Sequence, residues 1–233
     1  MTEPSAGGRI ATVFDDWARR GRAEGMSDSH GPAARMAFDR LDLQPDGRFL
    51  EIGCGNGYAV RWAARACPAG LAVGIDVAEA MIERARELSA ELDNVEFRHG
   101  LFPGVSLPVT RFDAVFSMET LYYLPERALD AALSEVARLL VPGGRFACAV
   151  NYYAENEASH SWPEDVGLEM TLLDADGWRR AFERAGLDVV EQARLVVPPD
   201  QATAEWHSTE GSLLTLGVAV QAGGEGTPPP SAR

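Results

Sequence analysis

Residues 49–58 read Phe-Leu-Glu-Ile-Gly-Cys-Gly-Asn-Gly-Tyr, a short apolar run that leads into three alternating glycines. The apolar run predicts a buried strand, and the glycines predict a tight turn that opens a helix. Glycine lets the backbone take positive φ and approach a ligand closely, and the first N–H groups of the following helix lack partners. The stretch therefore predicts a nucleotide-like ligand at this turn. The alternative is a tight connection that binds nothing.

On both sides of this turn, short apolar runs alternate with amphipathic helical patterns, which is typical of βαβ units and a mostly parallel sheet. Met81, Ala85, Leu88 and Leu92 recur on one helical face, and a second such series begins at Leu129. A further helix is expected at 176–185, with Asp174 or Asp176 as its N-cap and Gly186 as its stop. Seven strands are expected, the last two without a helix between them, at residues 49–52, 72–77, 95–98, 112–118, 145–150, 187–197 and 213–221.

The chain has 233 residues, the length of one α/β domain with at most a small addition. We divide it into an N-terminal helical or lid segment at 1–43, the sheet domain at 44–221 and a tail at 222–233. The tail contains three consecutive prolines, so we expect it to be disordered. The N-terminal segment, which holds Phe14, Trp17, Met26 and a helical stretch at 33–41, either packs on the sheet or covers its carboxyl edge.

Charge and composition exclude several classes of function. There are 35 acidic and 21 basic residues, a net charge of −14 that disfavours nucleic acids and anionic membranes as partners. Every basic residue is arginine, so a lysine Schiff base and a lysine-containing phosphate loop are excluded. Cys54, Cys67 and Cys148 stand far apart, and we expect neither a metal site nor a disulfide framework. The absence of a long apolar stretch or basic-then-apolar leader predicts a cytoplasmic protein.

Two acids and one missing glycine narrow the ligand. A dinucleotide fold favours GxGxxG, but the glycines here stand at 53, 55 and 57, and Tyr58 occupies the place of the third dinucleotide glycine. Glu51 lies in the strand before the turn, where its carboxylate either faces an ammonium group or is satisfied by backbone N–H groups. Asp76 ends the second strand, a position from which an acid can accept both hydroxyls of a ribose.

Four stretches together resemble the class I S-adenosylmethionine-dependent methyltransferases. They are EIGCGNG at 51–57, GIDVAEAMIERAR at 74–86, FDAVFSMETLYYLP at 112–125 and LLVPGGRF at 139–146. More narrowly, they resemble the small-molecule branch that includes the ubiquinone and menaquinone C-methyltransferases, over about residues 30–221. The resemblance implies a Rossmann-like α/β fold with seven strands, the last antiparallel, helices on both faces and an N-terminal helical lid.

The resemblance also implies a binding site for S-adenosylmethionine. Glu51 would lie near its amino group, Asp76 would hold the ribose, and Val77 and Met81 would flank the adenine. The family usually has a Gly-Asp pair after the third strand, but this sequence reads His-Gly-Leu-Phe at 99–102, which implies backbone contacts and weaker adenine selectivity. The remaining implied cofactor residues are Gly53, Cys54, Gly55, Asn56, Gly57, Gly100, Leu101, Phe102 and Met118.

The implied reaction is in-line transfer of a methyl group to a small-molecule acceptor, for which the protein supplies alignment and excludes water. An acceptor that loses a proton needs a base, and His30, Glu119 and Tyr123 are the candidate catalytic residues. For His30 the alternative is a cap or surface role, and for Tyr123 it is packing. The aromatic segment at 151–170, with Tyr153 and Trp162, is the second candidate acceptor region.

Two other functions stay open at this point. One is a regulator that binds S-adenosylmethionine without catalysis. The other is a nicotinamide-dependent oxidoreductase, which Tyr58 and the lack of any Tyr-x-x-x-Lys pair disfavour. The sequence leaves the acceptor, the methylated atom and the oligomeric state undetermined.

Overall fold

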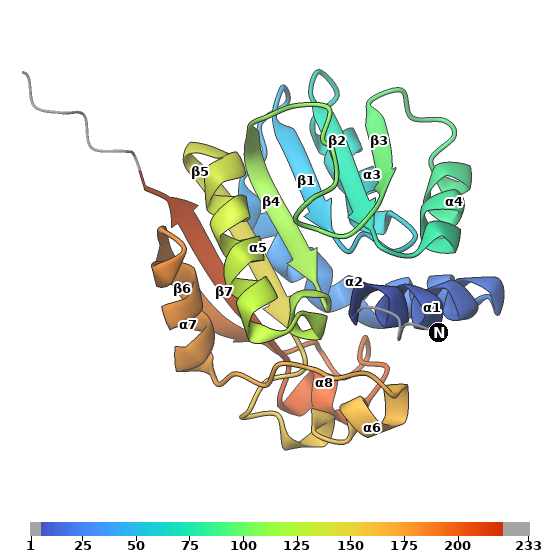
Figure 1. The fold of residues 1–233 in the computed structure, drawn as a ribbon, viewed down its shortest axis with the longest axis vertical. Helices are drawn as coiled ribbons and strands as arrows, with labels where there is room; N and C mark the ends of the chain where they lie inside the picture. The colour runs from blue at the N-terminus through green and yellow to red at the C-terminus, as the bar shows by residue number, and fades with distance from the viewer. Residues whose placement is uncertain (1–5, 221–233) are drawn as a thin grey trace, which may run out of the picture.

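The computed structural model describes residues 6–220, so the tail at 222–233 lies outside the described residues. Seven strands form one sheet in the order β3-β2-β1-β4-β5-β7-β6 (Figure 1). Strands β1 to β5 pair in parallel, whereas β7 is antiparallel to both β5 and β6. The Rossmann-like fold expected from the sequence is thereby confirmed. The strands are β1 (Arg48–Ile52), β2 (Leu71–Asp76), β3 (Val95–His99), β4 (Phe112–Met118), β5 (Leu140–Val150), β6 (Leu187–Leu195) and β7 (Ser212–Ala219).

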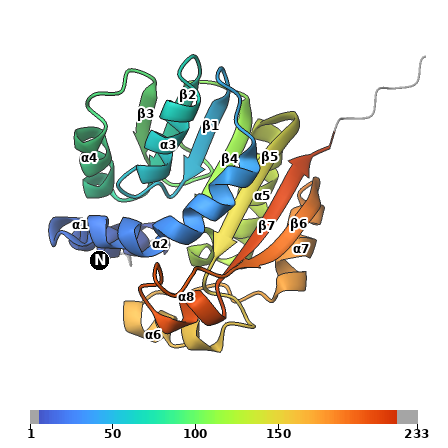
Figure 2. The ribbon, with the colours of Figure 1, turned by 180° about the vertical axis from the view of Figure 1, so that it is seen from behind.

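Helices cover both faces of the sheet. Helices α5 and α7 lie in front of it in Figure 1, and Figure 2 shows α2 and α3 across the opposite face. The α-helices are α1 (Ala6–Arg19), α2 (Arg22–Phe38), α3 (Tyr58–Ala66), α4 (Glu79–Leu88), α5 (Glu126–Leu139), α6 (Trp162–Val166), α7 (Ala175–Arg184) and α8 (Glu205–Thr209). The 3₁₀ turns are η1 (Asp39–Leu41), η2 (Leu121–Tyr123) and η3 (Glu157–Ser159).

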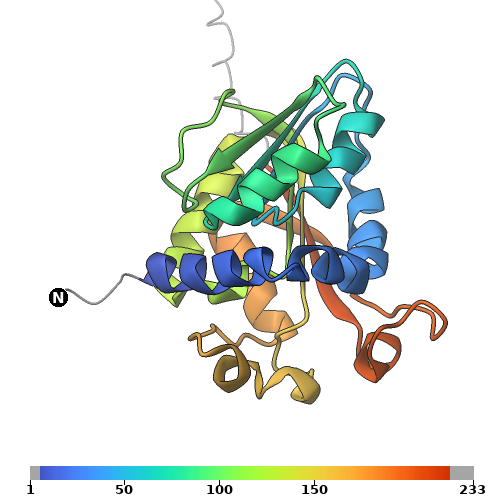
Figure 3. The same ribbon diagram turned by 90° about the vertical axis from the view of Figure 1, so that its right-hand side faces the viewer.

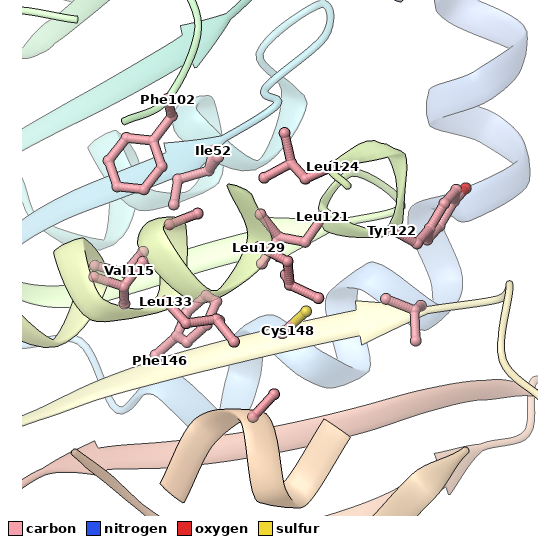
Figure 4. Close-up of a cluster of buried hydrophobic side chains, with 14 of the residues drawn as sticks. Ile52, Phe102, Val115, Leu121, Tyr122, Leu124, Leu129, Leu133, Phe146 and Cys148 are labelled. Carbon is pink, nitrogen blue, oxygen red and sulfur yellow. The ribbon is translucent and has the colours of Figure 1, made fainter. Parts of the chain in front are cut away.

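Alternating side chains of the strands build a separate hydrophobic core on each face. In β1, Leu50 belongs to the cluster beneath α5 and α7, whereas Phe49 belongs to the cluster beneath α2 and α3. Figure 4 shows part of the first cluster, between α5 and the sheet. Burying one such aliphatic or aromatic side chain contributes about 1.5–3 kcal/mol, so these two layers hold the sheet in register.

Two details differ from the expectations drawn from sequence, and a third decides between two alternatives. Helix α2 begins at Arg22, well before the expected stretch at 33–41. The five-residue helix α8 stands between β6 and β7, where no helix was expected, and its polar sequence lacks a repeating apolar face that would announce it. The cap of α7 is Asp174, whose Oδ1 accepts a hydrogen bond from the Gly177 N–H at 2.6 Å, as one of the two alternatives had it.

The N-terminal segment both packs on the sheet and covers its carboxyl edge. The second half of α2 is buried on the sheet, whereas α1 runs across the ends of the strands (Figure 3). Asp15 of α1 accepts a hydrogen bond from the Ala80 N–H at the start of α4, at 2.9 Å, and Glu24 of α2 pairs with Arg84 at 2.6 Å. These contacts hold α1 over the edge where open α/β sheets bind ligands. No helix within 6–220 is both long and apolar enough to cross a membrane.

Candidate functional site

A cavity of about 500 Å³ lies at the carboxyl edge, between the sheet and the helices α1, α2 and α6. Its volume falls in the range typical of small-molecule sites, roughly 300–1,000 Å³. The predicted cofactor residues that line it are Gly53, Cys54, Gly55, Asn56, Asp76, Val77, Met81, Gly100, Leu101, Phe102 and Met118. The three predicted catalytic residues, His30, Glu119 and Tyr123, line the same cavity. The fold therefore brings together residues as far apart in the sequence as His30 and Tyr123.

The three glycines of the turn have different reasons to be glycine. All have positive φ, at 73° for Gly53, 50° for Gly55 and 76° for Gly57. A Cβ on Gly53 would lie 2.1 Å from Thr120 Oγ1, and one on Gly57 would lie 2.7 Å from the Phe97 ring. A Cβ on Gly55 would meet no protein atom within 4 Å. Gly53 and Gly57 are thus needed for packing, and Gly55 leaves open space at the cavity.

Asp76 joins this turn to the end of β2. Its Oδ2 accepts a hydrogen bond from the Gly55 N–H at 2.8 Å, and its Oδ1 accepts one from the Ala78 N–H at 2.9 Å. Burial raises the pKa of Asp76, and the two backbone N–H groups oppose that rise. Because each carboxylate oxygen can accept more than one hydrogen bond, Asp76 keeps acceptor capacity for a ligand hydroxyl.

Glu51 does not occupy the place expected for it. Its side chain is buried behind the turn, where Oε2 accepts a hydrogen bond from the Val60 N–H of α3 at 3.1 Å, and Glu51 is not among the described residues that line the cavity. The expectation that Glu51 lies near a ligand amino group is therefore corrected in favour of the alternative, a carboxylate satisfied by a backbone N–H group. The physical reason is strand alternation, since Glu51 points to the same face as Phe49. Gly57 does not line the cavity either.

Glu119 follows β4 with an unusual backbone and an enclosed carboxyl group. Its φ is 56°, and its N–H donates to the Ala149 carbonyl at 3.0 Å. Oε2 accepts a hydrogen bond from the Tyr122 hydroxyl at 3.0 Å, whereas Oε1 is enclosed without a hydrogen bond. Burial raises the pKa of Glu119 to about 8, opposed by the Tyr122 hydroxyl and the amides of Asn151. Non-glycine residues with positive φ are uncommon and cluster at functional sites.

His30 reaches the cavity from α2. Its Nδ1 is buried without a hydrogen-bond partner in the structure. Burial, helped by nearby His207, lowers the pKa of His30 to about 4, so the ring is neutral at neutral pH. Tyr123, the third catalytic candidate, packs edge-on against Phe14 of α1 with ring centroids 5.4 Å apart. Between residues 6 and 220, no three His, Cys, Asp or Glu side chains are grouped to hold a metal.

The second candidate acceptor region divides into two parts. Trp162 lines the cavity from α6, as expected for a residue of an acceptor site. Tyr153 is buried elsewhere, and its hydroxyl donates to the carbonyls of Glu210 and Gly211 at 3.3 and 3.2 Å. Tyr153 therefore anchors the loop before β7, which corrects its expected place at the acceptor.

Sequence reasoning named Phe14 and Trp17 as part of the N-terminal segment without assigning them to a site, and it did not single out several other residues of the cavity wall. The series Ile10, Phe14 and Trp17, spaced as i, i+4 and i+7 on α1, was a readable signal for a helix with one apolar face. Other lining residues carry no such signal, because loops and the short helix α6 bring them in; they are Thr120, Leu124, Asp165 and Val166. Ser27 also lines the cavity, from α2.

Comparison with known proteins finds methyltransferases among the similar proteins. Residues 49–144, from β1 into β5, match the family model described as a methyltransferase domain. The chain resembles one chain of a solved complex, which is between the Haloferax volcanii Trm112 methyltransferase activator and a methyltransferase. Identity is 34% with a TM-score of 0.79, covering 89% of this chain and 98% of the other.

Two further proteins are similar to this chain, one in sequence and one in fold. The 27-O-demethylrifamycin SV methyltransferase of Amycolatopsis mediterranei is 36% identical over 64% of this chain and 56% of its own length. A structure of an S-adenosylmethionine-dependent methyltransferase from Mesorhizobium loti shares the fold at 22% identity, TM-score 0.64, covering 81% of this chain and 98% of that one. The chain spans between 46% and 65% of the length of the first curated relatives it matches.

Proposed function

The chain belongs to the class I S-adenosylmethionine-dependent methyltransferases, and from this premise we propose that it methylates a small-molecule acceptor. One observation carries the proposal: the Asp76–Gly55 pair and the aromatic side chains of α1 and η2 line one continuous cavity. A cofactor half and an acceptor half therefore share one cavity, which direct transfer between two bound molecules requires.

The residues present fit S-adenosylmethionine. Gly55 leaves open space beside the Asp76 carboxylate, and Val77, Met81 and Met118 provide apolar walls. Gly100, Leu101 and Phe102 occupy the place where the family usually has an acid, so we propose that backbone groups read the adenine there. When bound, the cofactor supplies a methyl group on a positively charged sulfur, which needs no metal or base for its own activation.

The contribution of the chain is to orient the acceptor, exclude water and accept a proton where one must leave. Phe14 and Trp17 of α1 cover the cavity, and Trp162 of α6 lines it from another side. We assign Glu119 the role of proton acceptor. His30 is assigned a neutral hydrogen-bonding role, because its Nδ1 lacks a partner, and Tyr123 the role of acceptor wall.

The acceptor class is also part of the proposal. The narrower resemblance to quinone C-methyltransferases is supported by the aromatic walls, which suit a flat ring. The rifamycin relative is named for methylation at oxygen, so the position of the new methyl group distinguishes the two possibilities.

The test measures S-adenosylhomocysteine formed from S-adenosylmethionine with a panel of phenols, quinols, amines and carboxylic acids. Calorimetry with S-adenosylmethionine and with NAD runs alongside it, on wild type, Asp76→Ala and the exposed control Asp188→Asn. Binding of S-adenosylmethionine with turnover of an acceptor supports the proposal. Binding without any turnover favours the regulator, and preference for NAD favours the oxidoreductase.

A protein partner enters the proposal through the Haloferax volcanii relative, which was solved with its Trm112 activator. We propose a small activator of that kind as a candidate partner of this chain. Co-expression with a Trm112 protein followed by size-exclusion chromatography tests it, and separate elution of the two proteins would contradict it.

A further inference from the structure

We propose that the acceptor is an uncharged, largely apolar molecule whose hydroxyl group gives its proton to Glu119, and that the cavity rejects anionic acceptors. The inference rests on the proposed function and adds the class of substrate and the fate of its proton.

The charges around the cavity have one sign. Asp76 and Asp165 line it, Glu119 adds a negative charge as the pH rises through about 8, and none of the described lining residues is arginine. Lysine is absent from the whole chain. An anionic acceptor would therefore lose its hydration without gaining a cationic partner, and unpaired buried charges are strongly disfavoured.

The acceptor half is apolar apart from its acids. Ile10, Phe14 and Trp17 line the cavity from α1, with Phe14 and Trp17 also packed near Met81. Tyr123 of η2, which packs against Phe14, and Trp162 of α6 line it as well. Flat aromatic surfaces of this kind bury a ring-shaped or aliphatic body well and leave only a few polar groups to orient it.

Glu119 is held in place by contacts that a flexible surface acid lacks. Its N–H is fixed on the Ala149 carbonyl, its Oε2 on the Tyr122 hydroxyl, and its backbone has a φ of 56°. The other oxygen, Oε1, is enclosed beside Asn151 and has no hydrogen bond. A carboxyl group positioned this firmly at a cavity wall suits proton transfer, which depends on geometry first.

The other titratable groups around Glu119 stay neutral near pH 8. Burial raises the pKa of Tyr58 on α3, of Tyr122 and Tyr123 on η2, and of the Cys148 thiol on β5. The pKa of Glu119 itself is raised to about 8 by burial. Within this set, Glu119 is the group that gains a negative charge as the pH rises through about 8.

In the proposed step the methyl group moves to the acceptor oxygen, and the proton of the acceptor hydroxyl moves to Glu119. The acceptor O–H bond breaks and its proton moves to the Glu119 carboxylate. The acceptor oxygen uses a lone pair to form a bond to the methyl carbon, while the carbon–sulfur bond breaks and leaves its electron pair on sulfur. The positive sulfur becomes a neutral thioether, and Glu119 later returns the proton to water.

An ammonium group fits the same cavity less well. It presents several N–H donors that all need acceptors when buried, whereas Glu119 already accepts from Tyr122 through Oε2, and Asp165 already accepts from Ser161 through Oδ2. A hydroxyl needs a single strong acceptor, which Glu119 supplies.

The first test measures binding without turnover. The protein with S-adenosylhomocysteine is titrated at pH 7 with three probes of one ring skeleton: 2-naphthol, 2-naphthoate and 2-naphthylmethylammonium. We expect 2-naphthol to bind at least about tenfold more tightly than either ion, a difference of about 1.4 kcal/mol. Repeated at pH 8.5, where more than half of Glu119 is ionised, the titration should give a smaller gap in affinity between 2-naphthol and 2-naphthoate in Glu119→Gln, whereas the exposed control Asp188→Asn should keep the wild-type gap. Equal or tighter binding of either ion, or no binding of 2-naphthol, overturns the inference.

The second test follows the proton. Infrared difference spectra of the protein with bound S-adenosylhomocysteine should show a protonated-carboxyl signal that fades as the pH rises through about 8, and Glu119→Gln should lack this signal. Burial also raises the pKa of Glu51, so Glu51→Gln is the matched variant that should keep the Glu119 signal. With an acceptor that the enzyme methylates, kcat/KM of the wild type should rise over the same pH interval. In Glu119→Gln, kcat/KM should not change with pH, and at high pH it should be lower than in the wild type by roughly 10²–10⁴-fold.

The two proposals fail in different ways. If S-adenosylmethionine binds and the methyl group reaches a carboxylate or an amine, the proposed function stands and this inference falls. If S-adenosylmethionine does not bind, the proposed function itself falls. A band or pH profile that Glu119→Gln leaves unchanged also overturns the inference.

Discussion

The backbone N–H of Gly55 donates a hydrogen bond to Oδ2 of Asp76 across 2.8 Å, and this bond ties the glycine turn after β1 to the end of β2. The other Asp76 oxygen holds the Ala78 N–H just before α4. One carboxylate therefore shapes the loop and also lines the cavity. Substitutions at Asp76 should change both stability and ligand affinity.

Replacing Asp76 by alanine removes the acceptor of both backbone N–H groups. We expect S-adenosylmethionine affinity to fall by about 1–3 kcal/mol and the free energy of unfolding to fall by a similar amount. Calorimetry and urea titration measure the two effects, with Asp76→Asn as the matched variant that keeps one oxygen. Unchanged affinity in a folded Asp76→Ala protein would contradict the assignment of Asp76 to the ligand.

The glycines at 53 and 55 should separate folding from binding. Gly55→Val should abolish cofactor binding because its side chain fills open space at the cavity, while the strained φ costs about 1–2 kcal/mol of stability. Gly53→Ala should lose more stability than Gly55→Ala, because its Cβ would lie 2.1 Å from Thr120 Oγ1. Thermal unfolding and calorimetry compare the variants. Tight cofactor binding by Gly55→Val would show that the turn is only a connector.

Trp162 and Tyr153 should behave differently although both lie in the aromatic segment. Trp162→Ala removes a wall of the cavity, so turnover should fall far more than cofactor affinity. Tyr153→Phe removes a hydroxyl bonded to two backbone carbonyls, which should cost about 1 kcal/mol of stability and leave kcat unchanged. Steady-state kinetics with a substrate that the enzyme methylates measure kcat of both variants. A lower kcat in Tyr153→Phe would contradict the prediction.

His30 should make the protein sensitive to acid. Its folded pKa of about 4 lies below the usual value of 6.5, so the unfolded chain binds the proton more readily. The corresponding stability is complete above about pH 6.5 and is lost as the pH falls towards 4. His30→Asn should reduce this loss by about 1–3 kcal/mol, compared with wild type and the exposed control His160→Asn. Urea titrations between pH 4 and 7 measure it, and parallel curves for all three proteins would refute the prediction.

Local sequence determined the elements of this fold. Apolar runs between turn residues located the seven strands, helical periodicity located α4 and α5, and Asp174 with Gly186 bounded α7. The glycine turn and Asp76 could be assigned to one site because the carboxyl ends of neighbouring parallel strands must meet at one edge. The elements could be located because each depends on chain geometry within a few residues, and the shared site could be assigned because neighbouring parallel strands run in one direction.

Only the tertiary structure decided where individual side chains of the site lie. Glu51 bonds to Val60 rather than lining the cavity, Tyr153 anchors a loop, and α1 lies over the strand ends. The raised pKa of Glu119 likewise depends on burial among residues of β5, η2 and α3. Each of these outcomes depends on packing between segments distant in sequence, and local propensities carry no information about such contacts.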